Sequence, residues 1–509
     1  MELQREQTAL AFWELAADFS AGQEETAEVI VPDSCPDIAR VLSAAGNVFL
    51  QQSEVREGKA TLSGVIRVSV LYIPEKSQTV QAACFTLPFQ MAESCPADCT
   101  ALCAEVSAEE LAAHTLNPRK LRLRCRLSAD ISAYRFVTLS YTSGIGAEPS
   151  CAVEQLPRQE TVELITALSE QEFTCEERFH LPQNRGGASA VLCTQLRCAV
   201  EDAKIIGTKA VVKGRYLTDI LMRYDSGSCE SSTFELPFSH ISEIDGPQTA
   251  HLSAHATLTA LTVEPERSEE GDGTLRLSVT SRLRLSVMQT QELRVVEDLY
   301  STAYPVSCEM QELRLLDAAQ PQLRRQVWQD TLELGVSVER VLRLSASCGT
   351  VTAAQDASGV PELRTTLRLY ALCLAEDGRV LSAERSAEVT LACPDAAGSV
   401  RCRAFCGEEM SSVATADGLL VRIPVDFCLR PRQFRMIRCV AAASLDETAP
   451  GELARQPSLV LRRKRAEESL WSLAKRHCST VGDILAANEC AAESELSADA
   501  MILIPRRRA

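Results

Sequence analysis

The chain has 509 residues, and its 69 acidic and 52 basic side chains give a net charge of −17 at pH 7. A chain of this length is expected to hold about three or four domains of roughly 100 to 200 residues each. The negative charge argues against nucleic acid as a partner, because a phosphate backbone attracts basic surfaces. No stretch reaches the about 18 consecutive apolar residues that a membrane-spanning helix requires, so we expect no transmembrane segment.

The first twenty residues offer no uninterrupted hydrophobic segment before a cleavage site, because Glu2, Arg5, Glu6 and Glu14 are spread among the apolar residues. We therefore expect no signal peptide and predict a cytoplasmic location. In a reducing compartment the 21 cysteines are expected to be thiols.

One stretch organises the rest of the chain. Leu62–Ile73, read as LSGVIRVSVLYI, alternates apolar and polar side chains with the period of two expected of a half-buried strand. A related stretch follows at Val212–Arg223, where Gly214 stands in the place of Gly64, and a looser copy occurs at Leu363–Leu374. The recurrence predicts a repeat of about 150 residues.

Other landmarks recur at the same separation. FTLPF at Phe85–Phe89 is matched by FELPF at Phe234–Phe238. Apolar residues alternate with polar ones at Leu121–Leu127, at Leu275–Thr280 and again at Leu419–Val425. We therefore predict a mainly β fold of three consecutive antiparallel units with short helices, followed by a small α+β domain.

The division that these features predict is residues 1–150, 151–304 and 305–443 for the units, 444–457 for a linker and 458–509 for the terminal domain. The linker is predicted from its polar composition, with Pro450, Gly451 and Pro457.

Two local predictions concern the strands' neighbours. Ile38, Val41 and Leu42 recur at helical spacing and Gly46 could end a helix, so we expect each unit to open with a short helix. Pro424 lies inside the third unit's strand pattern. Because proline donates no ladder hydrogen bond, we expect that strand at a sheet edge.

The last fifty residues differ in kind. Val460–Arg465 is predicted to be a strand, Ser469–His477 and Thr480–Glu489 short helices, and Met501–Pro505 a closing strand. The predicted order is βααβ.

This terminal segment resembles a LysM domain over residues 458–506, through SLW at Ser469–Trp471, LAKR at Leu473–Arg476 and LIP at Leu503–Pro505. The preceding units, with VPDSCPDI at Val31–Ile38 and the LPF elements, resemble SPOCS domains. Three such units ahead of a LysM domain resemble the SipL-like spore morphogenetic proteins of clostridia. The resemblance implies a noncatalytic scaffold in the mother cell that is recruited to the forespore surface. It also implies spore-coat proteins as partners, with the coat basement ATPase among them.

The LysM resemblance implies a ligand or partner groove and a small core. The groove residues would be Glu467, Glu468, Ser469, Asn488 and Asp499. The core residues would be Leu470, Trp471, Leu473, Ile484, Leu485 and Ile504. Side chains replace glycines that LysM domains carry in the groove loops, and this would reshape a sugar site. The expected partner is a protein, and the alternative is an N-acetylglucosamine-containing glycan of the cortex or cell envelope.

The sequence contains no phosphate-binding glycine loop, no His-Glu-x-x-His motif and no Gly-x-Ser-x-Gly elbow. We therefore expect no enzymatic activity, no catalytic residue, no cofactor and no metal. His251 and His255 are four residues apart, but their surroundings favour a strand over a metal-binding helix. Cys95, Cys99 and Cys103 form the densest thiol cluster, and we expect them to be buried and inert.

Overall fold

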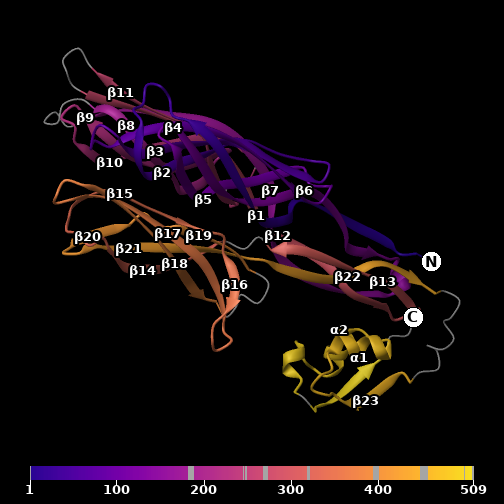
Figure 1. The fold of residues 1–509 in the computed structure, drawn as a ribbon. Coiled ribbons are helices and arrows are strands. Elements are labelled where there is room, and N and C mark those ends of the chain that lie inside the picture. The colour runs from indigo at the N-terminus through magenta and orange to yellow at the C-terminus, as the bar shows by residue number, and fades with distance from the viewer. Residues whose placement is uncertain are drawn as a thin grey trace.

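The computed structural model describes residues 2–181, 188–244, 246, 249–267, 273–317, 321–393, 400–446, 457–497 and 499–506. These residues are mainly β, and all the paired strands are antiparallel, as predicted (Figure 1). The helices α1 (Leu470–His477) and α2 (Val481–Ala487) lie near the C-terminus.

The first unit is built from six strands that form two sheets. They are β1 (Gln4–Ile30), β2 (Ile38–Arg56), β3 (Lys59–Pro74), β4 (Gln81–Ser94), β5 (Ala101–Asn117) and β6 (Lys120–Gly146). One sheet has the order β2-β3-β4, and in the other β6 lies between β1 and β5. The strands alternate between the core and the outside, so Ile66 and Val70 are fully buried while Arg67 is exposed.

The second unit repeats this plan. Its strands are β7 (Val153–His180), β8 (Ala188–Ile206), β9 (Lys209–Tyr224), β10 (Cys229–Glu243), β11 (His251–Arg267) and β12 (Gly273–Ser301). The sheet orders are β10-β9-β8 and β11-β12-β7. A pairing between Trp13 of β1 and Ile165 of β7 joins the two units into one six-stranded sheet.

The third unit keeps the pairing order but breaks its long outer strands in two. Its strands are β13 (Val306–Asp317), β14 (Gln322–Glu333), β15 (Val338–Cys348), β16 (Thr352–Gln355), β17 (Pro361–Ala375), β18 (Val380–Ala392), β19 (Val400–Cys406), β20 (Ser411–Thr415), β21 (Gly418–Pro431) and β22 (Gln433–Leu445). β13 pairs with β22 and β14 with β21, where the first unit has the single pair β1 and β6. The three predicted copies of the repeat strand lie in β3, β9 and β17, which confirms them as strands.

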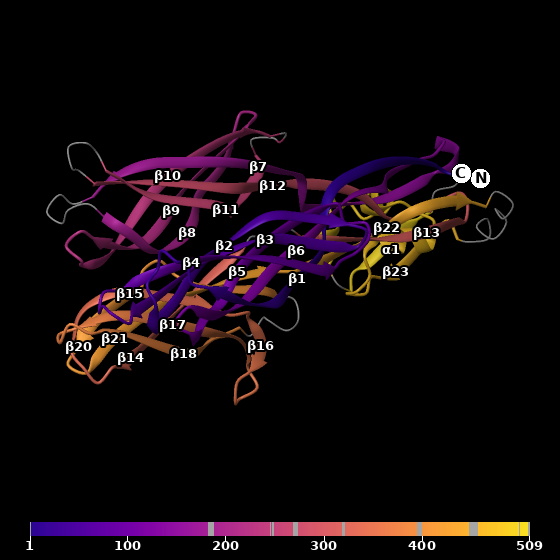
Figure 2. The same ribbon diagram turned by 45° about the horizontal axis from the view of Figure 1, so that its top comes forward.

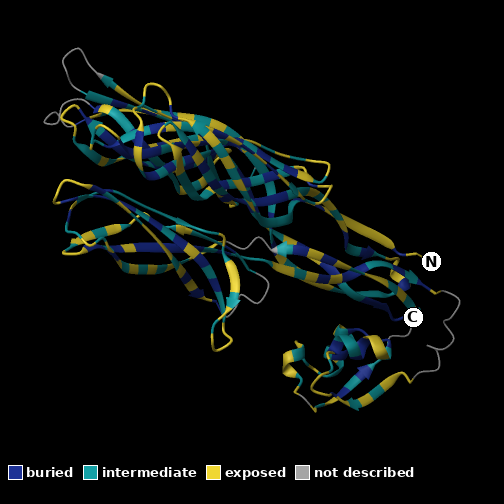
Figure 3. Ribbon diagram, in the orientation of Figure 1, coloured by how far each residue is buried: buried dark blue, intermediate teal, exposed yellow. Residues whose placement is uncertain are grey.

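The three units pack around shared apolar clusters. Leu42 of β2, Leu192 of β8 and Leu342 of β15 are buried together, and these three strands occupy equivalent places in their units. A second shared cluster joins Phe12, Leu164, Leu313 and their neighbours from the long outer strands. Figure 2 shows the units as three bodies side by side, and Figure 3 shows buried positions alternating with more exposed ones along their strands.

The predicted helix at the start of the first unit is wrong. Residues from Ile38 onward form β2, and register shifts fall between Ile38 and Arg40 and between Val41 and Ser43. Each irregularity moves the buried side by one residue, so the buried positions in a strand copy helical spacing. Gly46 does not end a helix. A Cβ at this position would lie 2.2 Å from the Arg67 carbonyl oxygen, so glycine permits the close approach of β2 and β3.

The predicted edge position of the Pro424 strand is also wrong. β21 lies between β14 on one side and the pair β19 and β20 on the other. Its pairings end at Val425 toward β19 and at Arg422 toward β20. Pro424 therefore falls in the break between two short strands, where no ladder donor is required, and its carbonyl accepts a hydrogen bond from Gly407 N at 2.8 Å.

The segment after the third unit was predicted to be a linker over residues 444–457. β22 extends through Leu445, and most of the remaining segment, residues 447–456, lies outside the described residues. The terminal segment has the order β23 (Leu459–Arg463), α1, α2 and β24 (Met501–Pro505), with a 3₁₀ turn at Glu493–Glu495. β23 and β24 pair antiparallel. This order of strands and helices is the one predicted.

Candidate functional site

The terminal module, residues 458–506, has a small apolar core between its helices and its two-stranded sheet. Leu470 and Leu473 of α1, Ile484 of α2 and Ile504 of β24 are at most 1% exposed. Leu485 is partly buried against the same cluster. Leu470, Leu473 and Ile484 therefore hold the helices on the sheet, where they meet Ile504, as the apolar faces of two short amphipathic helices imply.

Trp471 has a different position from the other core candidates. Its indole is half-buried and packs edge-on against Tyr300 of β12, with 4.8 Å between the ring centroids. Its Nε1 donates to Asp298 Oδ2 at 2.9 Å, and Lys475 Nζ pairs with Asp298 Oδ1 at 2.6 Å. Tyr300 also donates its hydroxyl proton to the Ser479 carbonyl at 2.8 Å. This face of α1 therefore docks the module onto the end of β12.

The five predicted groove residues lie in the loops around the two helices, and four of them have contacts inside the module. Ser469 caps α1 by accepting from Ser472 N at 3.2 Å. Glu468 accepts from Arg462 at 2.8 Å and from Arg476 at 2.9 Å. Glu467 is exposed.

Asn488 and Asp499 complete the predicted groove. The Asn488 side chain donates to the carbonyls of Ile484 and Leu503 at 2.7 Å each and accepts from Leu503 N at 2.8 Å, so it ties α2 to β24. Asp499 is exposed, has a left-handed backbone (φ 70°) and pairs with Arg463 at 3.2 Å. The contacts of Asn488 are structural, whereas Asp499 and Glu467 present their carboxylates to solvent.

The outer face of the module's sheet is apolar. Leu459 and Leu461 of β23 are 55% and 60% exposed, and Met501 of β24 is 59% exposed. Their neighbours Ile502 and Ile504 point to the opposite, buried side. The helices face the main body while β23 lies on the far side, so this outer face is turned away from the three units (Figure 1).

A second candidate site is a cavity of about 190 Å³ where the three units meet. Three equivalent strand pairs contribute to its lining, namely β5 with β6, β11 with β12, and β19 with β21. Each strand pair contributes two cross-strand pairs of residues to the lining. The first set is Cys103 with Ser132, Ser253 with Ser286 and Arg401 with Arg430. The second set, two residues farther along β5, β11 and β19, is Glu105 with Asp130, His255 with Arg284 and Arg403 with Cys428.

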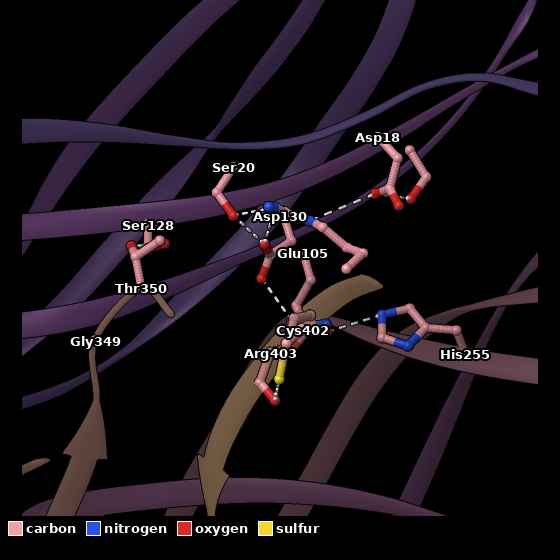
Figure 4. Close-up of polar contacts among 12 residues, drawn as sticks. Asp18, Ser20, Glu105, Ser128, Asp130, His255, Gly349, Thr350, Cys402 and Arg403 are labelled. Carbon is pink, nitrogen blue, oxygen red and sulfur yellow. Dashed lines mark hydrogen bonds and ion pairs between the residues drawn. The ribbon is translucent and has the colours of Figure 1, made fainter. Parts of the chain in front are cut away.

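A network of charged groups crosses this cavity wall (Figure 4). Glu105 of the first unit pairs with Arg403 of the third at 2.7 Å and with His255 of the second at 3.1 Å. Asp130 pairs with Arg403 at 2.5 Å and with Arg401 at 3.0 Å. The three units are thus joined by side chains at corresponding positions of their repeats.

The network changes the pKa of its members. Burial alone would raise the pKa of Glu105, but Arg403 and His255 together hold it well below its usual range. Glu105 keeps 36% of its side-chain surface accessible because it lines the cavity. Burial would lower the pKa of Arg403, and Glu105 with Asp130 reverses that effect.

Sequence reasoning missed this junction, although a signal was present. Glu105 and His255 occupy the same place in β5 and β11, 150 positions apart, which is the separation of the repeat.

His251 and His255 lie in β11, which confirms the strand prediction. Among the described residues, no three His, Cys, Asp or Glu side chains are grouped so that they could hold a metal ion. In the same part of the chain, no helix is long and apolar enough to cross a membrane.

Comparison with known families identifies part of the first unit. Residues 37–112 match the family model described as SipL, SPOCS domain. The chain therefore contains a SPOCS domain. The match covers β2, β3, β4 and most of β5, which include the strand after Gly64 and the first LPF element. Searches of the curated proteins and of the solved structures found no match to the chain. The SPOCS domain indicates a spore-related role in coat assembly.

Proposed function

We propose that the chain is a noncatalytic scaffold of spore-coat assembly, in which the terminal module and the β units bind other coat morphogenetic proteins. The observation that carries this proposal is the SPOCS match over residues 37–112. The shared clusters and the charged junction between the units support it, because they give the chain an extended body on which several partners could be held in fixed positions.

The terminal module is proposed to be a LysM domain that recognises protein. Its βααβ order and its buried leucines and isoleucines support the fold. The apolar outer sheet face of Leu459, Leu461 and Met501 supports a protein partner, since protein interfaces bury exposed apolar side chains at their centre. The partner would be the coat basement ATPase, and the location the mother-cell cytoplasm with recruitment to the forespore surface.

Co-purification from sporulating cells tests this proposal. We expect the full-length chain to retain the coat basement ATPase and a chain lacking residues 458–509 to lose it. Calorimetry with N-acetylglucosamine oligomers on the full-length chain separates the glycan alternative. Micromolar binding of the oligomers together with no retained coat protein would contradict the proposal.

A further inference from the structure

The cavity of about 190 Å³ where the three units meet, called the central cavity below, has basic side chains in its lining that no acidic side chain balances. The carboxylates of Asp18, Glu105 and Asp130 are all engaged by Arg401, Arg403 or His255. The carboxylate of Glu14 is engaged by Arg135, which lies outside the lining. Arg284 is paired with Glu170. Every acid on the cavity wall therefore already has a basic partner.

Two arginines in the lining, Arg430 and Arg432, have no acidic partner among the described residues. Arg430 lies directly across the strand ladder from Arg401, which is also basic. Like charges in direct cross-strand pairs are destabilising. Arg432 also makes no ion pair in this part of the chain, and its Nε is buried without a hydrogen-bond partner. A buried donor without an acceptor costs about 1–3 kcal/mol, so a ligand that supplied an acceptor to Arg432 would stabilise this wall.

The strand pattern places both arginines in this position. Phe427 and Leu429 of β21 are buried in the third unit's own core. The period of two turns Cys428 and Arg430 to the other side, and Arg432 follows at the same spacing just beyond the strand. The arginines thus face the first two units rather than solvent alone.

The remaining lining and the volume restrict the ligand. Phe12, Leu164 and Met288 supply apolar surface to the same cavity. About 190 Å³ exceeds the roughly 30 Å³ of one water and is below the about 300 Å³ of sites for drug-sized ligands. The apolar surface beside the two arginines favours an anion with an apolar body over inorganic phosphate.

We propose that the central cavity binds a small organic carboxylate, held by the guanidinium groups of Arg430 and Arg432 with its apolar body against Phe12, Leu164 and Met288. The planar fork of arginine matches the two oxygens of a carboxylate. The site is distinct from the partner surface of the terminal module and does not depend on the proposed function.

Thermal unfolding of the full-length chain with three probes tests the site. Benzoate should raise Tm, whereas benzyl alcohol, a neutral molecule of similar shape, and inorganic phosphate should not. Arg430→Gln and Arg432→Gln should each weaken benzoate binding about tenfold to a hundredfold, because each removes a charge-assisted contact. Arg422→Gln is the matched control, since Arg422 is an exposed arginine on the same strand.

The ligand-free variants supply a second readout that a purely structural role would not produce. Relief of the repulsion from Arg401 should leave Arg430→Gln as stable as the parent or more stable, while it no longer responds to benzoate. A benzoate shift that persists in both variants would overturn the proposal, and so would no shift in the parent chain. An equal response to phosphate and benzoate would overturn the assignment of an amphipathic carboxylate.

Discussion

Trp471 of the terminal module donates its indole proton to Asp298 of β12, at 2.9 Å, and the same carboxylate accepts from Lys475 at 2.6 Å. Residues more than 170 positions apart are therefore joined by one acid. The contact occupies one face of α1 and leaves the outer sheet face of Leu459, Leu461 and Met501 open. Docking of the module thus determines which of its surfaces a partner can reach.

Replacing Asp298 by alanine is predicted to release the module. A hydrogen bond to a charged group contributes about 1.5–3 kcal/mol, and Asp298 accepts from two donors. In a Trp13→Phe, Trp328→Phe background, the emission of Trp471 should shift to longer wavelength as the indole becomes hydrated. Asp202→Ala, which removes an acid paired with Lys204 on the surface, should leave the emission unchanged. An unshifted spectrum for Asp298→Ala would show that other contacts hold the module.

The docked state is predicted to depend on pH in the acidic range. Burial alone would raise the pKa of Asp298, but Lys475 and Trp471 outweigh it and the pKa is lowered. Because the pKa of Asp298 is lowered, the stabilisation of docking by its carboxylate is fully present above the pKa of a free aspartate, about 3.9. It is lost as pH falls through the pKa of Asp298 in the docked module. Trp471 emission should therefore change only below about pH 4, and Asp298→Asn should remove that transition. Release at neutral pH would contradict the assignment.

Glu105→Gln is predicted to weaken the junction of the three units. The change replaces the carboxylate that Arg403 and His255 contact by a neutral amide, and Arg403 keeps only Asp130 as an acidic partner. We expect a loss of about 1–2 kcal/mol in the free energy of unfolding. This is less than the 3–5 kcal/mol for breaking a dry ion pair, because Glu105 is partly accessible through the cavity. Denaturant unfolding measures this loss. Glu28→Gln is the control, because Glu28 pairs with Lys120 on the surface, and its free energy of unfolding should change by no more than about 0.5 kcal/mol.

Gly64→Ala is predicted to destabilise the first unit. An added Cβ would lie 2.0 Å from the Phe49 carbonyl oxygen, so β2 and β3 would have to separate locally. Overpacking of this kind costs about 1–3 kcal/mol. Gly22→Ala is the matched control on β1, because its nearest contact would be 3.7 Å. Equal unfolding midpoints for the two variants would show that the glycine shared by the first two repeat strands is not required by packing.

The strands could be predicted because alternation and recurrence are local signals. Leu62–Ile73 and its copies show the period of two, and Gly64 and Gly214 mark the same close approach of neighbouring strands. The helix predicted around Ile38 failed because irregularities in β2 imitate helical spacing. The edge predicted for Pro424 failed because a sequence does not show that its neighbour strand is broken.

The sites were harder to predict, because they depend on contacts between units. The module's internal core follows from helical spacing, but the position of Trp471 against Asp298 and Tyr300 depends on how the module docks. Glu105, His255 and Arg403 come together only because equivalent strands of three repeats converge. Aligning the repeats at their separation of 150 residues would have shown that Glu105 and His255 are at equivalent positions. The alignment would not have shown that the two side chains contact each other.

In the proposed scaffold, the terminal module binds a coat protein through its outer sheet face. Leu461→Glu tests it most directly, because Leu461 is 60% exposed on that face and its replacement should leave the fold intact. Ile206→Glu, at a position 55% exposed on β8, is the matched control. In co-purification from sporulating cells, we predict that Leu461→Glu loses the coat basement ATPase while Ile206→Glu retains it. Equal retention by both variants would contradict the account.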